Sequence, residues 1–129
     1  MERLLRRQDF LAAARGRSRA TQGAVVQIRC REDEKPPRIG FTVTRKLGGA
    51  VTRNRIRRRL KEAVRTGATG CFRPGHDYVI IGRSATAGRP LTKLIDDIIS
   101  AVDYLHGPGG QEVPAAGGRG RRRPKQDSL

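Results

Sequence analysis

The sequence predicts a small α/β domain of the α+β type with two layers, in which helices pack against one β-sheet. Segments 24–31 and 38–44 alternate apolar and polar residues with a period of two, which is typical of strands. Segments 51–65 and 91–105 repeat apolar residues every three or four positions, which indicates amphipathic helices. The 129 residues, 36% hydrophobic and 4% aromatic, suffice for one domain with a mostly aliphatic core.

The first half of the chain contains a helix followed by three strands. Residues 3–15 fit a short amphipathic helix that ends at Gly16, where glycine adopts a left-handed conformation at little cost. Residues 17–21 fit a short edge strand, and the strand at 24–31 follows it. An acidic turn then leads into the strand at 38–44.

The second half of the chain alternates helix, strand and helix. The helix at 51–65 has one apolar stripe, and arginines occupy its other faces. A loop rich in Gly, Thr and Pro is expected at 66–75. The short apolar run at 78–81 is typical of a buried central strand, and the helix at 91–105 completes the domain.

We expect one domain over residues 1–106 and a disordered basic tail over residues 107–129. The tail is rich in Gly, Pro and Arg and has few apolar residues. It therefore buries too little surface to offset the entropy of ordering.

The charge of the chain is large and local. The formal net charge is +16 at pH 7. Residues 38–65 hold ten Lys and Arg against the single acid Glu62, whereas residues 66–106 are balanced and fit a scaffold. Such a concentration of cations is most easily tolerated beside a polyanion, which makes nucleic acid the leading partner.

The sequence disfavours a membrane protein, a secreted protein and a protein built around a metal site or disulfides. No apolar stretch approaches the roughly 20 residues that a membrane helix needs, and the N-terminus lacks an apolar signal core. Cys30 and Cys71 lack the spacing of a metal site or a disulfide framework. We expect a cytoplasmic protein with two reduced thiols, no metal site of its own and no membrane partner.

A self-contained nuclease is also disfavoured, because it needs clustered carboxylates or a nucleophile with a base. The adjacent acids Asp96 and Asp97 fall on the solvent side of the helix at 91–105. Neither His76 nor His106 has an evident partner. We therefore expect no catalytic residue in this chain.

Like charges repeat at four-residue spacing along the helix at 51–65. Each such pair costs roughly 0.2–0.5 kcal/mol in an isolated helix, and a bound phosphate backbone would reverse the sign. No acid follows Gly48-Gly49 in the first turn, where the helix dipole favours an anion. The repeated cations are Arg53, Arg57 and Lys61 on one side, and Arg55 and Arg59 on another.

The run KLGGAVTRNRIRRRL, residues 46–60, closely resembles the Arg-Asn-Arg signature of the bacterial ribonuclease P protein component family. The resemblance covers residues 3–105. The flanks that match are Asp9-Phe10, Gly16, Ile39-Gly40-Phe41 and the segment 76–81.

The resemblance implies the element order α-β-β-β-α-β-α with a left-handed βαβ crossover that contains the basic helix, a ribosomal protein S5 domain 2-like fold. It implies the protein subunit of ribonuclease P, an endoribonuclease holoenzyme whose catalytic centre lies in its RNA subunit. The partners implied are that catalytic RNA and precursor tRNA. The protein assists Mg²⁺-dependent removal of the 5′ leader, and the Mg²⁺ is held mainly by the RNA subunit and the substrate.

The resemblance also implies two sets of site residues. Asn54 in the first set can fix a sugar or phosphate, or cap a neighbouring loop. In the second set only Phe10 matches the family; Arg19 and Ala24 stand where relatives carry aromatic residues, so we expect arginines to carry more of the leader contact. The RNA-subunit set is Arg45, Lys46, Arg53, Asn54, Arg55, Arg57, Arg58, Arg59 and Lys61, and the leader set is Phe10, Arg17, Arg19 and Arg29.

Two alternative functions remain beside this one. A structural RNA-binding protein, such as a ribosomal component, has the same composition but not the signature. A DNA-binding helix-turn-helix needs a helix before the basic helix, and the predicted strand at 38–44 occupies that place. No DNA partner is therefore expected.

Overall fold

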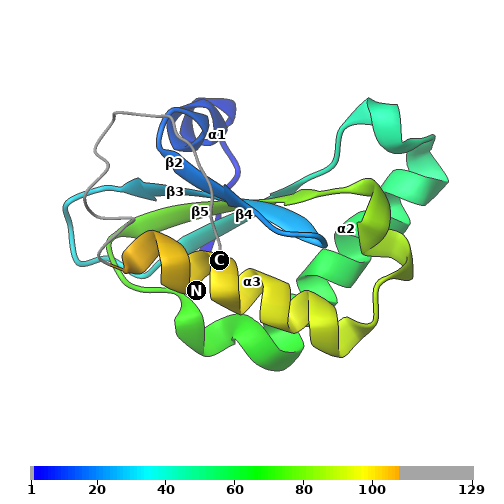
Figure 1. Cartoon of the computed structure of the whole chain (residues 1–129). Coiled ribbons are helices and arrows are strands. Elements are labelled where there is room, and N and C mark those ends of the chain that lie inside the picture. The colour runs from blue at the N-terminus through cyan, green and yellow to red at the C-terminus, as the bar shows by residue number, and fades with distance from the viewer. Residues whose placement is uncertain (1, 108–129) are drawn as a thin grey trace.

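A five-stranded sheet forms the centre of the molecule, and helices lie on both of its faces (Figure 1). The computed structural model describes residues 2–107. The basic tail predicted at 107–129 lies, apart from its first residue, outside the described residues. In spatial order the strands are β1 (Glu2–Arg3), β4 (Arg38–Thr42), β5 (His76–Gly82), β3 (Ala24–Cys30) and β2 (Arg17–Ala20).

The central position of β5 confirms the prediction from its apolar run. This strand pairs parallel with β4 and antiparallel with β3. Tyr78 and Ile80 are fully buried on one face, and Val79 is buried on the other. At the two edges, β1 runs parallel to β4 and β2 runs antiparallel to β3.

Three α-helices cover the two faces of the sheet unequally. Helix α1 (Arg7–Ala14) lies on one face, whereas α2 (Ala50–Ala63) and α3 (Leu91–His106) pack on the other (Figure 1). Because α2 connects the parallel neighbours β4 and β5, the predicted strand-helix-strand crossover is confirmed. The mixed α/β class and the predicted order of elements are confirmed as well, with β1 as an addition.

The main core lies between the sheet and the two helices α2 and α3. Ile56 and Leu60 of α2 and Ile98 of α3 are at most 1% exposed, and they belong to one apolar cluster with Ile28 and Ile80 of the sheet. Burying one such side chain contributes about 1.5–3 kcal/mol. The apolar stripe of α2 therefore fixes which of its faces is left for solvent.

The N-terminal helix begins later than its pattern predicts. Residues 2 and 3 form β1 instead, because Glu2 N donates to Pro37 O and Leu4 N to Ile39 O, both at 2.9 Å. The open edge of β4 supplies these hydrogen bonds. Two residues are too few for a period of two to be visible in the sequence.

Helical turns flank α2 where a strand end and a loop were expected. The strand predicted at 38–44 stops at Thr42, and a 3-10 turn follows at Arg45–Leu47. The loop predicted at 66–75 begins instead with a π-helical turn at Val64–Ala68 and a 3-10 turn at Thr69–Cys71. Val64 and Ala68 are buried in the main core, so tertiary packing stabilises turns that local composition disfavours.

A smaller apolar cluster holds α1 on the opposite face of the sheet. It consists of Leu4, Ala13 and Val79, with Phe10 and Ile81 packed against it. A Cβ at position 40 would lie 2.5 Å from Phe10 Cζ. The glycine of β4 therefore leaves the space in which the Phe10 ring lies across the strand.

Candidate nucleic-acid interface

Helix α2 presents its cations away from the core. Its buried stripe packs on the sheet, which leaves Arg55, Arg58 and Lys61 exposed and Arg53, Arg57 and Arg59 half-buried. Within residues 2–107, none of these six cations forms an ion pair. The structure therefore brings the predicted RNA-subunit residues of this helix together as one positively charged surface.

Three of these arginines use neutral groups of the protein as acceptors. Arg53 Nε donates to Gly48 O at 3.1 Å, and Arg57 Nη1 donates to Asn54 Oδ1 at 2.8 Å. Arg59 Nε donates to Thr86 O at 3.1 Å, and its Nη2 donates to Arg89 O. Asn54 thus orients a neighbouring arginine, and Arg59 ties α2 to the turn before α3.

The single acid of α2 lies at the far end of the helix from its signature. Glu62 accepts a hydrogen bond from Arg65 Nη2 and, at 3.1 Å, from Thr66 Oγ1. These contacts lower the pKa of Glu62. Glu62 is therefore engaged by Arg65, and the central arginines keep their charge without a carboxylate partner.

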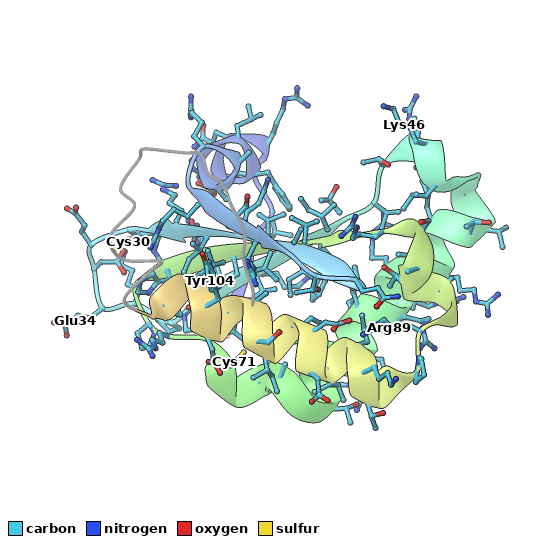
Figure 2. The ribbon with its side chains drawn as sticks, viewed as in Figure 1. Cys30, Glu34, Lys46, Cys71, Arg89 and Tyr104 are labelled. Carbon is cyan, nitrogen blue, oxygen red and sulfur yellow. The ribbon has the colours of Figure 1, made fainter. Side chains whose placement is uncertain are left out.

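The turn before α2 adds two more cations to this surface. Arg45 and Lys46 are exposed, and Lys46 extends away from the body of the molecule (Figure 2). Gly48 has a φ of 137°, a conformation that favours glycine. Gly49 is the N-cap of α2 and provides no side-chain cap, and the first turn of α2 has no acid. The N–H groups of this first turn are therefore available to an external anion.

The four predicted leader residues lie on two faces of the sheet. Phe10 packs on the face that α1 covers, and Arg29 joins it there through Asp9 of α1, at 3.7 Å. Arg17 and Arg19 pair with Ile28 and Val26, whose side chains lie in the main core on the opposite face. The structure therefore does not bring all four residues together.

The two arginines of β2 contact α3. Arg17 Nη1 donates to Leu105 O at 3.2 Å, and burial lowers the pKa of this arginine. The guanidinium of Arg19 lies 4.1 Å from the ring centroid of Tyr104. Arg17 and Arg19 therefore lie across the edge strand β2 from the face that α1 covers.

A buried carboxylate organises the α1 face. Asp77 is fully buried and lies beside Arg29 and Arg38 in the register of the sheet. Arg38 Nε and Nη2 donate to its two oxygens at 2.8 Å, and Arg31 Nη1 donates at 2.5 Å. Burial alone raises the pKa of Asp77, but the hydrogen bonds from Arg38 and Arg31 outweigh burial and lower it.

The same charges reach α1 through Asp9. Arg38 Nη1 lies 3.4 Å from Asp9 Oδ2, and Arg29 Nη1 bridges Asp9 and Asp77 at 3.7 and 3.6 Å. The sequence predicts residues 66–106 to be a charge-balanced scaffold, and the burial of Asp77 fits this role. The ion pairs of Asp77 were not predicted. They could have been expected from its position in a strand between two strands that carry arginines.

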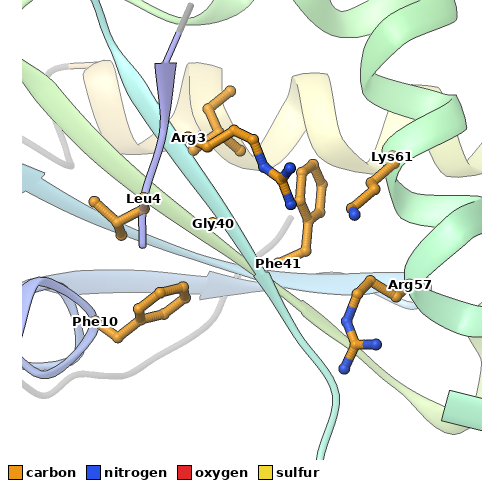
Figure 3. Close-up of a pocket in the computed structure, with 8 residues that line it drawn as sticks. Arg3, Leu4, Phe10, Gly40, Phe41, Arg57 and Lys61 are labelled. Carbon is orange, nitrogen blue, oxygen red and sulfur yellow. The ribbon is translucent and has the colours of Figure 1, made fainter. Parts of the chain in front are cut away.

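A pocket of about 170 Å³ lies between the two candidate surfaces (Figure 3). Phe10 lines it from α1, Gly40 and Phe41 from β4, and Arg57 and Lys61 from α2. The positively charged surface of α2 and the face of the sheet that α1 covers therefore meet at this pocket. Phe41 both packs against the main core and lines this pocket.

Two expectations about titratable residues are wrong. Asp97 is not a solvated acid, because Arg89 Nε and Nη2 donate to its two oxygens. His106 does have a partner, since its Nε2 lies 2.6 Å from the Tyr78 hydroxyl in the interior. Burial lowers the pKa of His106 to about 4. Both side chains therefore form contacts within the fold, Asp97 with Arg89 and His106 with Tyr78.

Residues 2–107 contain no group of three or more His, Cys, Asp or Glu side chains that could hold a metal ion. Cys30 and Cys71 are free thiols. Among the helices of this part of the chain, none has the length and apolar character to cross a bilayer.

The fold and the unpaired cations of α2 define a small, basic nucleic-acid-binding protein of the α/β class. The family described as Ribonuclease P matches residues 1–106. The chain therefore belongs to the ribonuclease P protein component family, the protein subunit of the endoribonuclease that processes the 5′ ends of tRNA.

Relatives and solved structures agree with this assignment. The chain is 47% identical over 108 residues to the ribonuclease P protein component of Ruegeria pomeroyi, covering 81% of this chain and 86% of that protein. It is 46% identical over 105 residues to that of Caulobacter vibrioides, covering 81% and 70%. The ribonuclease P protein from Thermotoga maritima has a similar structure, with a TM-score of 0.65 at 28% identity over 78% of this chain and 94% of that one.

Proposed function

We propose that this chain binds the catalytic RNA of ribonuclease P through α2 and the turn before it, and the 5′ leader of precursor tRNA along the α1 face of the sheet. One observation carries the first half of the proposal. The eight cations of the predicted RNA-subunit set form no ion pair within residues 2–107. Phosphates are the partners that would compensate these charges and release counterions.

The cations of this surface have different parts in the proposal. Four cations are exposed and their side chains make no hydrogen bond within the described residues, so they are the strongest candidates for phosphate contacts: Arg45, Lys46, Arg55 and Arg58. Arg53 and Arg57 are oriented by neutral acceptors. Arg59 is already bonded to two carbonyl groups, and we assign it mainly to holding α2 in place.

The leader site is proposed at Phe10 and Arg29. The half-buried ring of Phe10 borders the pocket at β4, and stacking of one base on an aromatic ring is worth about 1–3 kcal/mol. The Arg29 side chain is 38% exposed, and its ion pairs are long, at 3.6 and 3.7 Å. It can therefore turn toward a phosphate while α1 stays anchored by Arg38.

We propose that Mg²⁺ is held mainly by the RNA subunit and the substrate, because the described residues do not form a cluster that fits a metal ion. Asp77 is occupied by arginines and is unsuited to be a ligand. The part of this chain is to neutralise phosphates that would otherwise repel one another. A cytoplasmic location follows for a bacterial protein that works on precursor tRNA.

The test is 5′ cleavage of a precursor tRNA at low Mg²⁺ with the full chain and a bacterial ribonuclease P RNA together, with the RNA alone, and with the protein alone. We expect cleavage only with both components. Cleavage by the protein alone would contradict the assignment of chemistry to the RNA. Absence of stimulation with cognate and related RNAs would favour a structural RNA-binding protein.

A further inference from the structure

A second and larger pocket opens at the short edge of the sheet. It has a volume of about 410 Å³. It shares four residues with the smaller pocket, so the two are continuous around the end of β1. We call it the β1-edge pocket, and it is lined by Glu2, Arg3, Ile39, Phe41, Lys61, Val64, Arg65 and Thr69.

The floor of the β1-edge pocket is apolar. Ile39 and Val64 are each 4% exposed and belong to the main core. Phe41 packs against that core, is only half-buried and lines the pocket. The pocket exists because β1 has two residues and leaves the far end of β4 uncovered.

The rim of the β1-edge pocket is positively charged. Arg3 and Lys61 are exposed, and neither has an ion pair or a side-chain hydrogen bond within residues 2–107. Both side chains point toward the ring of Phe41 from opposite sides (Figure 3). Arg65, the third cation, pairs with Glu62, and Glu2 is the one acid in the lining.

We propose that the β1-edge pocket binds one unpaired nucleotide of the catalytic RNA, with its base on Phe41 and its phosphates beside Arg3 and Lys61. An aromatic floor under unpaired cations is the combination that holds single-stranded nucleic acid. This inference rests on the proposed function and adds to it a stacking contact with one base that is turned out of the RNA.

The position of the pocket favours the catalytic RNA over the leader as the source of the nucleotide. Lys61 comes from α2, and Val64 and Arg65 come from the turn that continues it. Phe10, the proposed leader residue, does not line this pocket. RNA that docks on α2 therefore runs past the mouth of the pocket.

The chain contains no tryptophan, so a single tryptophan introduced into the pocket gives a fluorescence signal from that position alone. In the full-length protein, Phe41→Trp places a single indole in the floor of the pocket. We expect its fluorescence to be quenched when ribonuclease P RNA is added without precursor tRNA, because a base stacks on the ring. Quenching only after precursor tRNA is added would overturn the choice of the catalytic RNA.

Val51→Trp is the matched reporter for docking itself. Val51 lies in the first turn of α2, is 82% exposed and does not line the pocket. A response at both positions supports the inference. A response at position 51 without one at position 41 overturns the pocket and leaves the proposed function intact, whereas silence at both overturns the proposed function and the inference with it.

A loss of affinity should accompany loss of the ring. Phe41→Leu should weaken binding of the RNA subunit about 5- to 150-fold, the effect of losing one stacked base. Phe72→Leu is the control, because Phe72 is a core ring that does not line the pocket. Equal affinities of the two variants for the RNA, with both folded by circular dichroism, would contradict the inference.

Discussion

At the scale of single residues, Asp77 is the side chain on which the α1 face depends most. It is fully buried and accepts hydrogen bonds from Arg31 and Arg38. Removing one partner of a buried ion pair costs about 3–5 kcal/mol, and here Arg31 and Arg38 would each lose their fully buried counterion while keeping the more exposed acids Asp33 and Asp9. We expect Asp77→Asn to lower the free energy of unfolding by an amount near that range, measured by urea denaturation.

Asp33→Asn is the control for this effect. Asp33 accepts two hydrogen bonds from Arg31, but solvent reaches it, so screening leaves little net contribution. We expect its free energy of unfolding to stay close to that of the parent. Equal losses for the two variants would mean that Arg31, and not the burial of Asp77, determines the stability of this region.

His106 should make stability depend on pH. Its folded pKa is about 4, and the unfolded value is about 6.5, so the unfolded chain binds the proton more tightly. Stability is therefore complete above about pH 6.5 and falls by about 3 kcal/mol as the pH drops to about 4. Thermal melting across this range measures it. His106→Gln should remove the slope between about pH 6.5 and pH 5, because the carboxylates with lowered pKa, Asp33, Glu62 and Asp77, lose their stabilising effect only as the pH falls through about 4.5 and below.

Residue types were easier to predict from the sequence than residue surroundings. The position of Phe10 against β4 agrees with a role in the α1 face, but its space depends on Gly40, which no local pattern indicates. Arg17 and Arg19 could have been placed by register, since residues opposite Val26 and Ile28 share their face. The Tyr78–His106 contact joins two segments 28 residues apart, and spacing along the chain does not indicate it.

At the scale of elements, α2 should contribute most of the salt dependence of RNA binding. Arg55 and Arg58 are exposed, and within residues 2–107 their side chains form no ion pair or hydrogen bond. We expect Arg55→Ala with Arg58→Ala to make the slope of log K against log salt shallower by roughly 2, about one per phosphate contact. Filter binding of the RNA subunit at several salt concentrations measures this slope.

Arg73→Ala with Lys93→Ala removes the same charge from other elements. Arg73 and Lys93 are exposed and lie outside the proposed surfaces, so the slope should change little. A slope that falls equally in both double variants would show that net charge, rather than the placement of α2, controls binding.

The long periodic elements could be predicted from sequence, and the short or tertiary ones could not. Helices α2 and α3 end within two residues of their predicted bounds because their apolar stripes face a continuous core. Strand β1 depends on hydrogen bonds that β4 offers. The turns after α2 depend on burial of Val64 and Ala68. Both features arise only after the rest of the chain has folded.

At the scale of the whole molecule, the charge is divided between residues 2–107 and a segment outside the described residues. Residues 108–129 hold five cations and two acids with few apolar residues. Their cations are Arg119, Arg121, Arg122, Arg123 and Lys125. Such a composition favours weak, sequence-independent attraction to RNA over a specific contact.

A chain that ends after Gly107 tests this division. It keeps every residue of the main core and of both proposed surfaces, so its melting temperature and its cleavage rate at saturating protein and low Mg²⁺ should equal those of the full chain. Its affinity for unrelated RNA should fall and lose part of its salt dependence, because up to five phosphate contacts disappear. A truncated protein that binds unrelated RNA as before but no longer supports cleavage would assign the tail a specific role in the holoenzyme.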